Sequence, residues 1–144
     1  MKLGTMKKYK SKIGLGIVLF IAVVFGCALT LMITKHDWLG VIIIIVVIGF
    51  ITHLFITTYY TINGNDLIVK SGFIINKVIK IDTIKKIEET NNPLSSPAVS
   101  LDRIAIDYNE HNSVMISPKD KMDFINQLKT INENIVVILK KKKT

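Results

Sequence analysis

Residues 13–34 read IGLGIVLFIAVVFGCALTLMIT, a run without a single charged side chain. As a helix at about 1.5 Å per residue, this run reaches roughly 33 Å, the thickness of the hydrocarbon core of a bilayer. A short charged turn follows, and residues 39–56 are again strongly apolar. The β-branched part at 41–48 would favour a strand in water, but a strand that is apolar on both faces needs covering helices, and this short chain has none to spare. The pattern predicts two transmembrane helices, at 13–34 and 39–56, joined by a loop at 35–38.

The composition of the whole chain agrees with a membrane protein. Of its 144 residues 49% are hydrophobic and 21% charged, and the mean hydropathy is +0.42, which is too apolar for an ordinary soluble domain. The single cysteine, Cys27, excludes an internal disulfide framework and a zinc site built from cysteines. Lipidation of Cys27 is disfavoured because Phe25 is bulky where a cleavage box needs a small residue and because residues 28–33 stay apolar.

The net charge of +8 lies at the two ends of the sequence. Residues 1–12 hold five Lys and no acidic residue, and residues 140–143 are four consecutive Lys. Residues 57–139 carry nine basic and ten acidic side chains, a net charge of −1. Because phosphate binding needs cations clustered on the folded part, we expect no nucleic-acid partner.

The flanking charges also predict a topology. Cytoplasmic segments retain Lys and Arg, so the basic segment 1–12 is expected in the cytoplasm and the loop at 35–38 outside. Trp38, Tyr59 and Tyr60 fall where aromatic rings prefer the membrane interface. Two crossings return the chain to its starting side, so the domain at 57–139 and the polybasic tail at 140–144 are expected in the cytoplasm as well.

Beyond residue 56 the pattern changes to short alternating runs separated by turn residues, which predicts β structure. Turn residues stand at 63–65, at 71–72 and at 109–112. Six or seven strands are expected, at 57–62, 66–70, 73–78, from 79 to 87, 101–108 and 114–117, with residues 135–139 as a last strand or as a segment against the membrane.

The last large element is expected to be a helix. Ser117 can cap its first amides, Pro118 fits the first helical position and Asp120 follows three residues after the cap. Apolar residues then recur at helical spacing, at Phe124, Ile125, Leu128 and Ile131, with Met122 beside them. The predicted fold is therefore a membrane-anchored α+β protein: an N-terminal transmembrane helical hairpin, then a PH-like antiparallel β-barrel or sheet capped by a C-terminal α-helix.

The same part of the chain resembles a known family. Residues 92–104 read NPLSSPAVSLDRI, and Ile106, Tyr108, the ISPK segment at 116–119 and Phe124 follow. This block resembles the bacterial PH domain of the YyaB type over roughly residues 57–135. The resemblance implies a PH-like fold behind one or two membrane helices and no established catalytic activity. One branch of that family resembles self-immunity factors against a secreted antimicrobial peptide, and this chain departs from the pattern in its polybasic end and its long second apolar run.

No catalytic site, cofactor or metal site is expected. The three histidines, His36, His53 and His111, fall in the outer loop, a membrane helix and a hairpin turn, so they cannot converge on one site. Ser95 and Ser96 lack both a Gly-x-Ser-x-Gly elbow and a partner histidine. Gly72 is the last glycine of the chain, so no glycine-rich phosphate loop occurs.

Asp102 and Arg103 are the most informative charged pair. They are adjacent at the start of a strand, so their side chains are expected on opposite faces, with one of them buried. Two interpretations stay open: the pair holds residues 91–100 by charge-assisted hydrogen bonds, or that segment faces a ligand such as an anionic headgroup or a peptide carboxylate. The candidate binding or structural motif comprises Ser95, Ser96, Ser100, Asp102, Arg103, Ser117 and Lys119.

The predicted function is non-catalytic binding at the inner face of the bacterial plasma membrane. A PH-like sheet leaves an edge and a groove beside its terminal helix, where a regulatory protein or peptide can dock. The alternatives are self-immunity against a secreted antimicrobial peptide and binding of anionic lipid. Lys140, Lys141, Lys142 and Lys143 are candidate lipid contacts, at about 1 kcal/mol each, or a solvated charge run. The net charge of 57–139 argues against a strongly basic lipid site on the domain, and the oligomeric state is left open.

Overall fold

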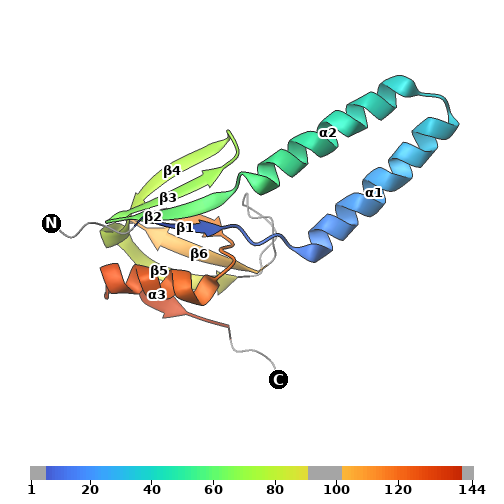
Figure 1. Ribbon diagram of the computed structural model, residues 1–144. Helices are drawn as coiled ribbons and strands as arrows, with labels where there is room; N and C mark the ends of the chain where they lie inside the picture. The colour runs from blue at the N-terminus through green and yellow to red at the C-terminus, as the bar shows by residue number, and fades with distance from the viewer. Residues whose placement is uncertain (1–5, 91–101, 141–144) are drawn as a thin grey trace.

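The computed structural model describes residues 6–90 and 102–140, and it contains a pair of long helices beside a two-sheet domain (Figure 1). The elements in chain order are β1 (Lys7–Lys10), α1 (Leu15–Thr34), α2 (Trp38–Ile56), β2 (Tyr59–Asn63), β3 (Asp66–Ser71), β4 (Ile75–Lys80), the 3₁₀ turn η1 (Ile81–Thr83), β5 (Ile84–Thr90), β6 (Arg103–Tyr108), β7 (Asn112–Ile116), α3 (Lys121–Ile131) and β8 (Val136–Ile138). The predicted order, an apolar helical hairpin followed by sheet and a terminal helix, is confirmed.

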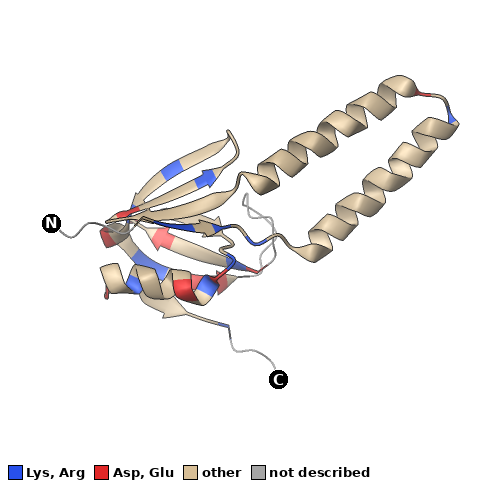
Figure 2. Ribbon diagram, in the orientation of Figure 1, with Lys and Arg blue, Asp and Glu red and all other residues tan. Residues whose placement is uncertain are grey.

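The helices α1 and α2 project away from the sheets, and their charged residues lie only at the turn between them (Figure 2). No residue of α1 is buried, and in α2 only Gly40 and Ile44 are. Asp37 begins α2 by accepting a hydrogen bond from the Gly40 amide at 3.1 Å. Both helices are long and apolar enough to cross a membrane, and almost none of their apolar surface is covered by the rest of the protein.

The strands of the described residues form two four-stranded sheets, ordered β1-β2-β3-β4 and β7-β6-β5-β8. Neighbouring strands are antiparallel, except that β8 runs parallel to β5. The predicted last strand is thus confirmed, with a parallel pairing that the sequence pattern did not indicate. Apolar side chains of the two sheets meet in one core, and α3 joins it through Phe124, which contacts Tyr9 and Tyr60 edge-on at ring distances of 5.1 and 6.3 Å.

The sheets form a PH-like sandwich and do not close into a barrel. Across the described ranges, no strand ladder joins one sheet to the other. A single bridge between Ser11 and Pro118 connects them at one corner. The prediction offered a barrel or a sheet, and the open form is the one observed.

The predicted start of the terminal helix is wrong. The helix begins at Lys121, and its N-cap residue Asp120 makes no side-chain capping bond. Residues 117–119 instead lie beside residues 10–12: the Lys12 amide donates to the Ser117 carbonyl at 2.6 Å, and the Lys119 amide donates to the Lys10 carbonyl at 3.0 Å. Pro118, which has no amide to donate, suits such an edge position. Pairing with residues far away in the sequence therefore takes the place of the helix cap that the local pattern predicted.

That partner is β1, which the sequence analysis placed outside the folded domain as part of a basic end. β1 pairs with β2 so that Tyr9 faces Tyr60 across the ladder. Tyr9 and Ser11 are buried, while the lysines between and around them are exposed. The folded domain therefore includes Lys7, Lys8 and Lys10, and it is more basic than residues 57–139 alone.

The helical hairpin is an insertion between two adjacent strands. The Ser11 amide donates to the Thr58 carbonyl at 3.3 Å, so the chain leaves the sheet after β1 and returns to it at the same place before β2. Both helices therefore emerge from one end of the domain, which we call the helix-proximal end. The strand directions place the β3–β4 turn, the end of β5, the start of β6, residues 117–119 and the end of β8 at this end.

Candidate binding groove at the helix-proximal end

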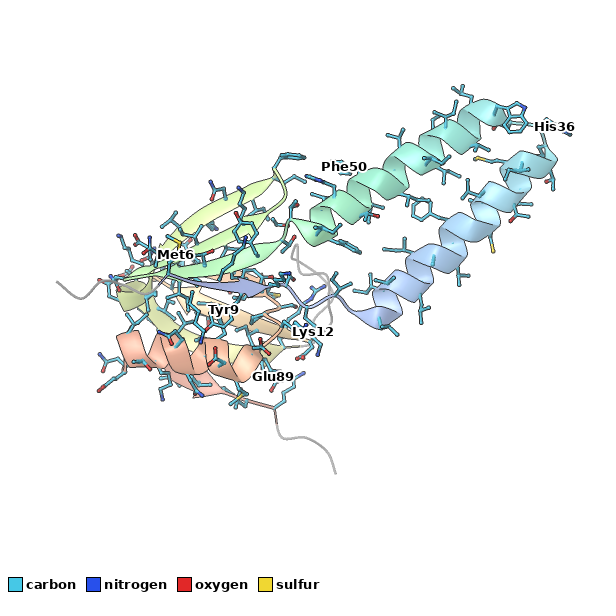
Figure 3. The ribbon with its side chains drawn as sticks, viewed as in Figure 1. Met6, Tyr9, Lys12, His36, Phe50 and Glu89 are labelled. Carbon is cyan, nitrogen blue, oxygen red and sulfur yellow. The ribbon has the colours of Figure 1, made fainter. Side chains whose placement is uncertain are left out.

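Residues that are distant in the sequence meet at the helix-proximal end. Of the candidate motif, Asp102, Arg103, Ser117 and Lys119 lie here, and Lys140 lies here at the end of β8. Figure 3 shows Lys12 and Glu89 in the same region. Ser95, Ser96 and Ser100 lie outside the described residues, as do Lys141, Lys142 and Lys143.

An open groove of about 590 Å³ lies here beside the terminal helix. The first turn of α3 forms one wall, and the ends of β5 and β8 contribute the others. Its lining includes Glu89, Asp102, Lys121, Met122, Leu139 and Lys140. Met122 and Leu139 are the exposed apolar side chains among them.

Lys121 holds three elements of the groove together. Its ammonium lies 2.7 Å from Asp102 Oδ1 and also bonds Glu89 Oε1. On the other side, Lys12 Nζ lies 2.8 Å from Asp102 Oδ2. The Lys121 and Glu89 side chains are only 18% and 17% exposed, so this contact is screened less than an ordinary surface pair. The network ties α3 to β5, to the start of β6 and to the segment after β1.

The ion pairs shift the pKa values of Asp102, Glu89 and Lys121 in the directions that favour their charged forms. The hydrogen bond from Lys12, followed by that from Lys121, lowers the pKa of Asp102 below its ordinary value. The hydrogen bond from Lys121 likewise lowers the pKa of Glu89. Burial lowers the pKa of Lys121, but its bonds to Asp102 and Glu89 outweigh burial and raise that pKa overall. All three groups are therefore charged at neutral pH.

A second contact from β1 fixes the same helix. Lys7 Nζ lies 2.7 Å from Asp123 Oδ2, and the Tyr9 hydroxyl donates to that oxygen at 2.8 Å. In Figure 3 Tyr9 lies between β1 and α3. From the sequence, the lysines of residues 1–12 were predicted only to set the membrane topology, so the contacts of Lys7 and Lys12 with the folded domain were missed. The alternation of buried Tyr9 and Ser11 with lysines was the available signal.

Ser117 belongs to the interior and not to the groove. It is fully buried, and its amide donates to the Tyr60 hydroxyl at 3.1 Å. That hydroxyl donates in turn to Ser11 Oγ at 3.2 Å. Burial raises the pKa of Tyr60, and the hydrogen bonds with Ser11 and Ser117 and the charge of Arg103 oppose part of the rise. Ser117 thus joins the two sheets at the corner where Ser11 and Pro118 form their bridge.

Arg103 and Asp102 differ in environment, as expected for neighbours with opposite orientations. Arg103 is only 4% exposed, whereas Asp102 reaches the groove. A buried guanidinium needs partners to offset its desolvation, which fits a structural role better than a ligand-facing one. Lys119, in contrast, is exposed on the groove wall.

The arrangement suits binding. The charged side chains that bridge the groove pair with one another, and exposed apolar atoms of Met122 and Leu139 stand beside them. Within residues 6–90 and 102–140, no cluster of three or more His, Cys, Asp or Glu has the geometry to hold a metal ion. The groove therefore offers a contact surface for a peptide segment of another protein that carries apolar side chains.

Comparison with known proteins gives one finding. Residues 58–132, which is more than half of the chain, match a family model described as bacterial PH domain. The match begins just before β2 and ends just after α3, so it leaves out β1, the helical hairpin and β8. No curated protein and no solved structure shows a significant match. The finer resemblance to the YyaB type stays a prediction.

Proposed function

Because the chain belongs to the bacterial PH domain family, we propose that it is a membrane-anchored binding module that holds a protein or peptide partner at the cytoplasmic face of the plasma membrane. PH domains are generally binding modules without catalytic activity. The groove beside α3 carries this proposal. It lies at the end of the domain from which the helices emerge, so a partner in it would sit close to the bilayer.

Anchoring is supported by the surface of α1 and α2. Their apolar side chains are exposed along both helices, and in water such a surface would be a severe aggregation liability. Inside a bilayer the same helices satisfy their own backbone groups and bury these side chains in lipid. Because β1 pairs with β2, the segments before and after the hairpin must lie on the same side of the membrane. The lysines flanking α1 favour the cytoplasmic side.

A protein partner is favoured over a lipid headgroup by the balance of charge in the groove. Three lysines line the groove, Lys119, Lys121 and Lys140, against four acidic residues, Glu89, Asp102, Asp120 and Asp123, and Lys12 pairs with Asp102 from beside it. A groove without an excess of cations attracts an anionic headgroup only weakly, because several cations without matching acids are needed. Met122 and Leu139 instead offer apolar contact to the side chains of a peptide.

The test places a photo-crosslinking amino acid at Met122 in the full chain, within native membranes. His111, exposed in the β6–β7 turn at the opposite end of the domain, serves as the control. The proposal expects a discrete protein adduct from position 122 and none from position 111. Identical adducts from both positions, or lipid adducts alone from position 122, contradict it.

Anionic lipid is the second candidate because Lys140 continues into three further lysines. A tail of this kind gains affinity from anionic lipid and loses it in salt. Lipid adducts from position 122 that disappear when Lys140–Lys143 are replaced by Gln would favour this candidate.

A self-immunity role would use the same groove, and it predicts that deleting the protein sensitises the producing cell to its own secreted peptide.

A further inference from the structure

The turn between β3 and β4 exposes two large apolar side chains. Residues 72–74, which we call the hairpin tip, connect Ser71 to Ile75. Phe73 is 79% exposed and Ile74 is 70% exposed. Turns facing water are normally built from polar residues and glycine, so this tip is a candidate for contact with something apolar.

The tip is docked on the last turns of α2. The Phe73 ring stacks on the His53 ring at 4.9 Å with 15° between the planes. Gly72 has a positive φ of +54°, and a Cβ there would lie 2.3 Å from Leu54 Cδ2. Ser71 Oγ and Thr58 Oγ1 share a hydrogen bond at 2.9 Å. Figure 1 shows the β3–β4 turn beside the domain end of α2.

These contacts fix the level of the tip along the helix axis. His53 lies three residues before Ile56, the last residue of α2, which corresponds to about 4.5 Å along the helix. Phe73 therefore lies level with the apolar part of α2 and not below its end. Ile56, which is also strongly exposed, continues the same apolar surface.

The charges around the tip complement an anionic lipid surface. Lys70 lies beside it, and the nearest acidic residues along the hairpin, Asp66 and Asp82, are at its far end. The Lys77 ammonium instead lies 5.7 Å from the centroid of the Tyr108 ring, at the far end of β6. Beside Lys70 on the outer face of the sheet, the Tyr59 ring has Lys8 Nζ at 3.8 Å and Lys70 Nζ at 5.7 Å from its centroid. Apolar residues bordered by lysines and an aromatic ring are typical of segments that enter the membrane interface.

We propose that the hairpin tip inserts Phe73 and Ile74 into the interfacial layer of the bilayer that α1 and α2 cross, with Lys8 and Lys70, the two lysines beside Tyr59, at the headgroups. The inference rests on the proposed membrane anchoring and is independent of which partner fills the groove. With the tip inserted, the domain has a third point of attachment beside its two helices. Its tilt is then set, and the groove keeps one orientation toward the membrane surface.

The experiment uses the full chain in vesicles of phosphatidylcholine and phosphatidylglycerol, with and without lipids brominated near the headgroup. The native Trp38, the chain's one tryptophan, reports on anchoring. A Trp38→Phe background then carries Phe73→Trp or Ile74→Trp as probes of the tip. His111→Trp, in the exposed β6–β7 turn at the opposite end of the domain, is the matched control.

We expect brominated lipid to quench Phe73→Trp and Ile74→Trp while leaving His111→Trp unchanged, and we expect the tip probes to emit at shorter wavelength. If Trp38 is quenched and neither tip probe is, the tip proposal is overturned and anchoring stands. If Trp38 itself is not quenched, anchoring fails and the tip proposal fails with it. Circular dichroism of each variant establishes that the domain is folded.

Discussion

Lys121 is the residue on which the groove depends most. Replacing it with Met removes the cation shared by Glu89 and Asp102 and leaves two partly buried carboxylates with less compensation. We expect Lys121→Met to lower the free energy of unfolding by about 1–3 kcal/mol. Urea denaturation of the full chain in detergent measures this. Lys129→Met, on the exposed side of the same helix, should change stability by less than about 0.5 kcal/mol, and equal losses in the two variants would refute the assignment.

The same network predicts a dependence of stability on pH. The folded protein lowers the pKa of Glu89 from 4.5 and that of Asp102 from 3.8, chiefly through lysine hydrogen bonds. Each carboxylate therefore adds stability above its ordinary pKa, and this stability is lost as the pH falls through the lowered value. Below about pH 5 the wild type should lose stability more steeply than Lys121→Met. Parallel pH profiles of the two proteins would contradict this expectation.

Substitutions at Gly72 and Gly64 distinguish the cost of backbone strain from the cost of losing the contact between the hairpin tip and α2. Both have positive φ, +54° and +59°, but a Cβ at Gly64 meets no atom within 4 Å, whereas one at Gly72 collides with Leu54. Gly64→Ala should cost about 1–2 kcal/mol from strain alone. Gly72→Ala should lower the free energy of unfolding by more than this, because Leu54 must also move and the hairpin tip loses its contact with α2. Equal unfolding free energies for the two variants would show that the tip is not docked.

At the scale of elements, β1 makes the domain complete. Because Ser11 and Thr58 are hydrogen-bonded neighbours, a short Gly-Ser linker in place of residues 13–57 should give a folded, water-soluble domain. A fragment of residues 57–144 lacks Tyr9, so Tyr60 and Phe124 lose their cover, and we expect it to be unfolded or aggregated. Circular dichroism and gel filtration compare the two. A well-folded fragment would show that β1 is dispensable.

The elements that the sequence predicted well are those with a local signal. The uncharged runs predicted α1 and α2, and the alternating residues predicted most strands to within a few positions. β1 was missed because lysines occupy all but two positions from 7 to 12 and mask the alternation of Tyr9 and Ser11. The start of α3 was misplaced because Ser117 and Lys119 form hydrogen bonds with Lys12 and Lys10, a pairing that no local pattern reveals.

At the scale of the molecule, the candidate site depended on long-range pairing. Asp102 and Lys119 were singled out from the sequence, but Lys12, Glu89 and Lys121 were not. Their meeting requires β1 at the sheet edge, and the groove wall at Leu139 and Lys140 requires β8 parallel to β5. Neither pairing follows from hydrophobic periodicity. The arrangement places the groove and the hairpin tip at the same end as the helices, which is the end that faces the bilayer in the proposed anchored state.

Cysteine accessibility in intact cells tests the anchored arrangement most directly. Cys27 is replaced by Ser, and single cysteines are introduced at His36, in the turn between the helices, and at His111, at the far end of the domain. A membrane-impermeant maleimide should label position 36 in intact cells and position 111 only after the membrane is opened. Labelling of both positions in intact cells, or of neither until the cells are opened, would contradict a hairpin that crosses the membrane and holds the PH domain on its inner face.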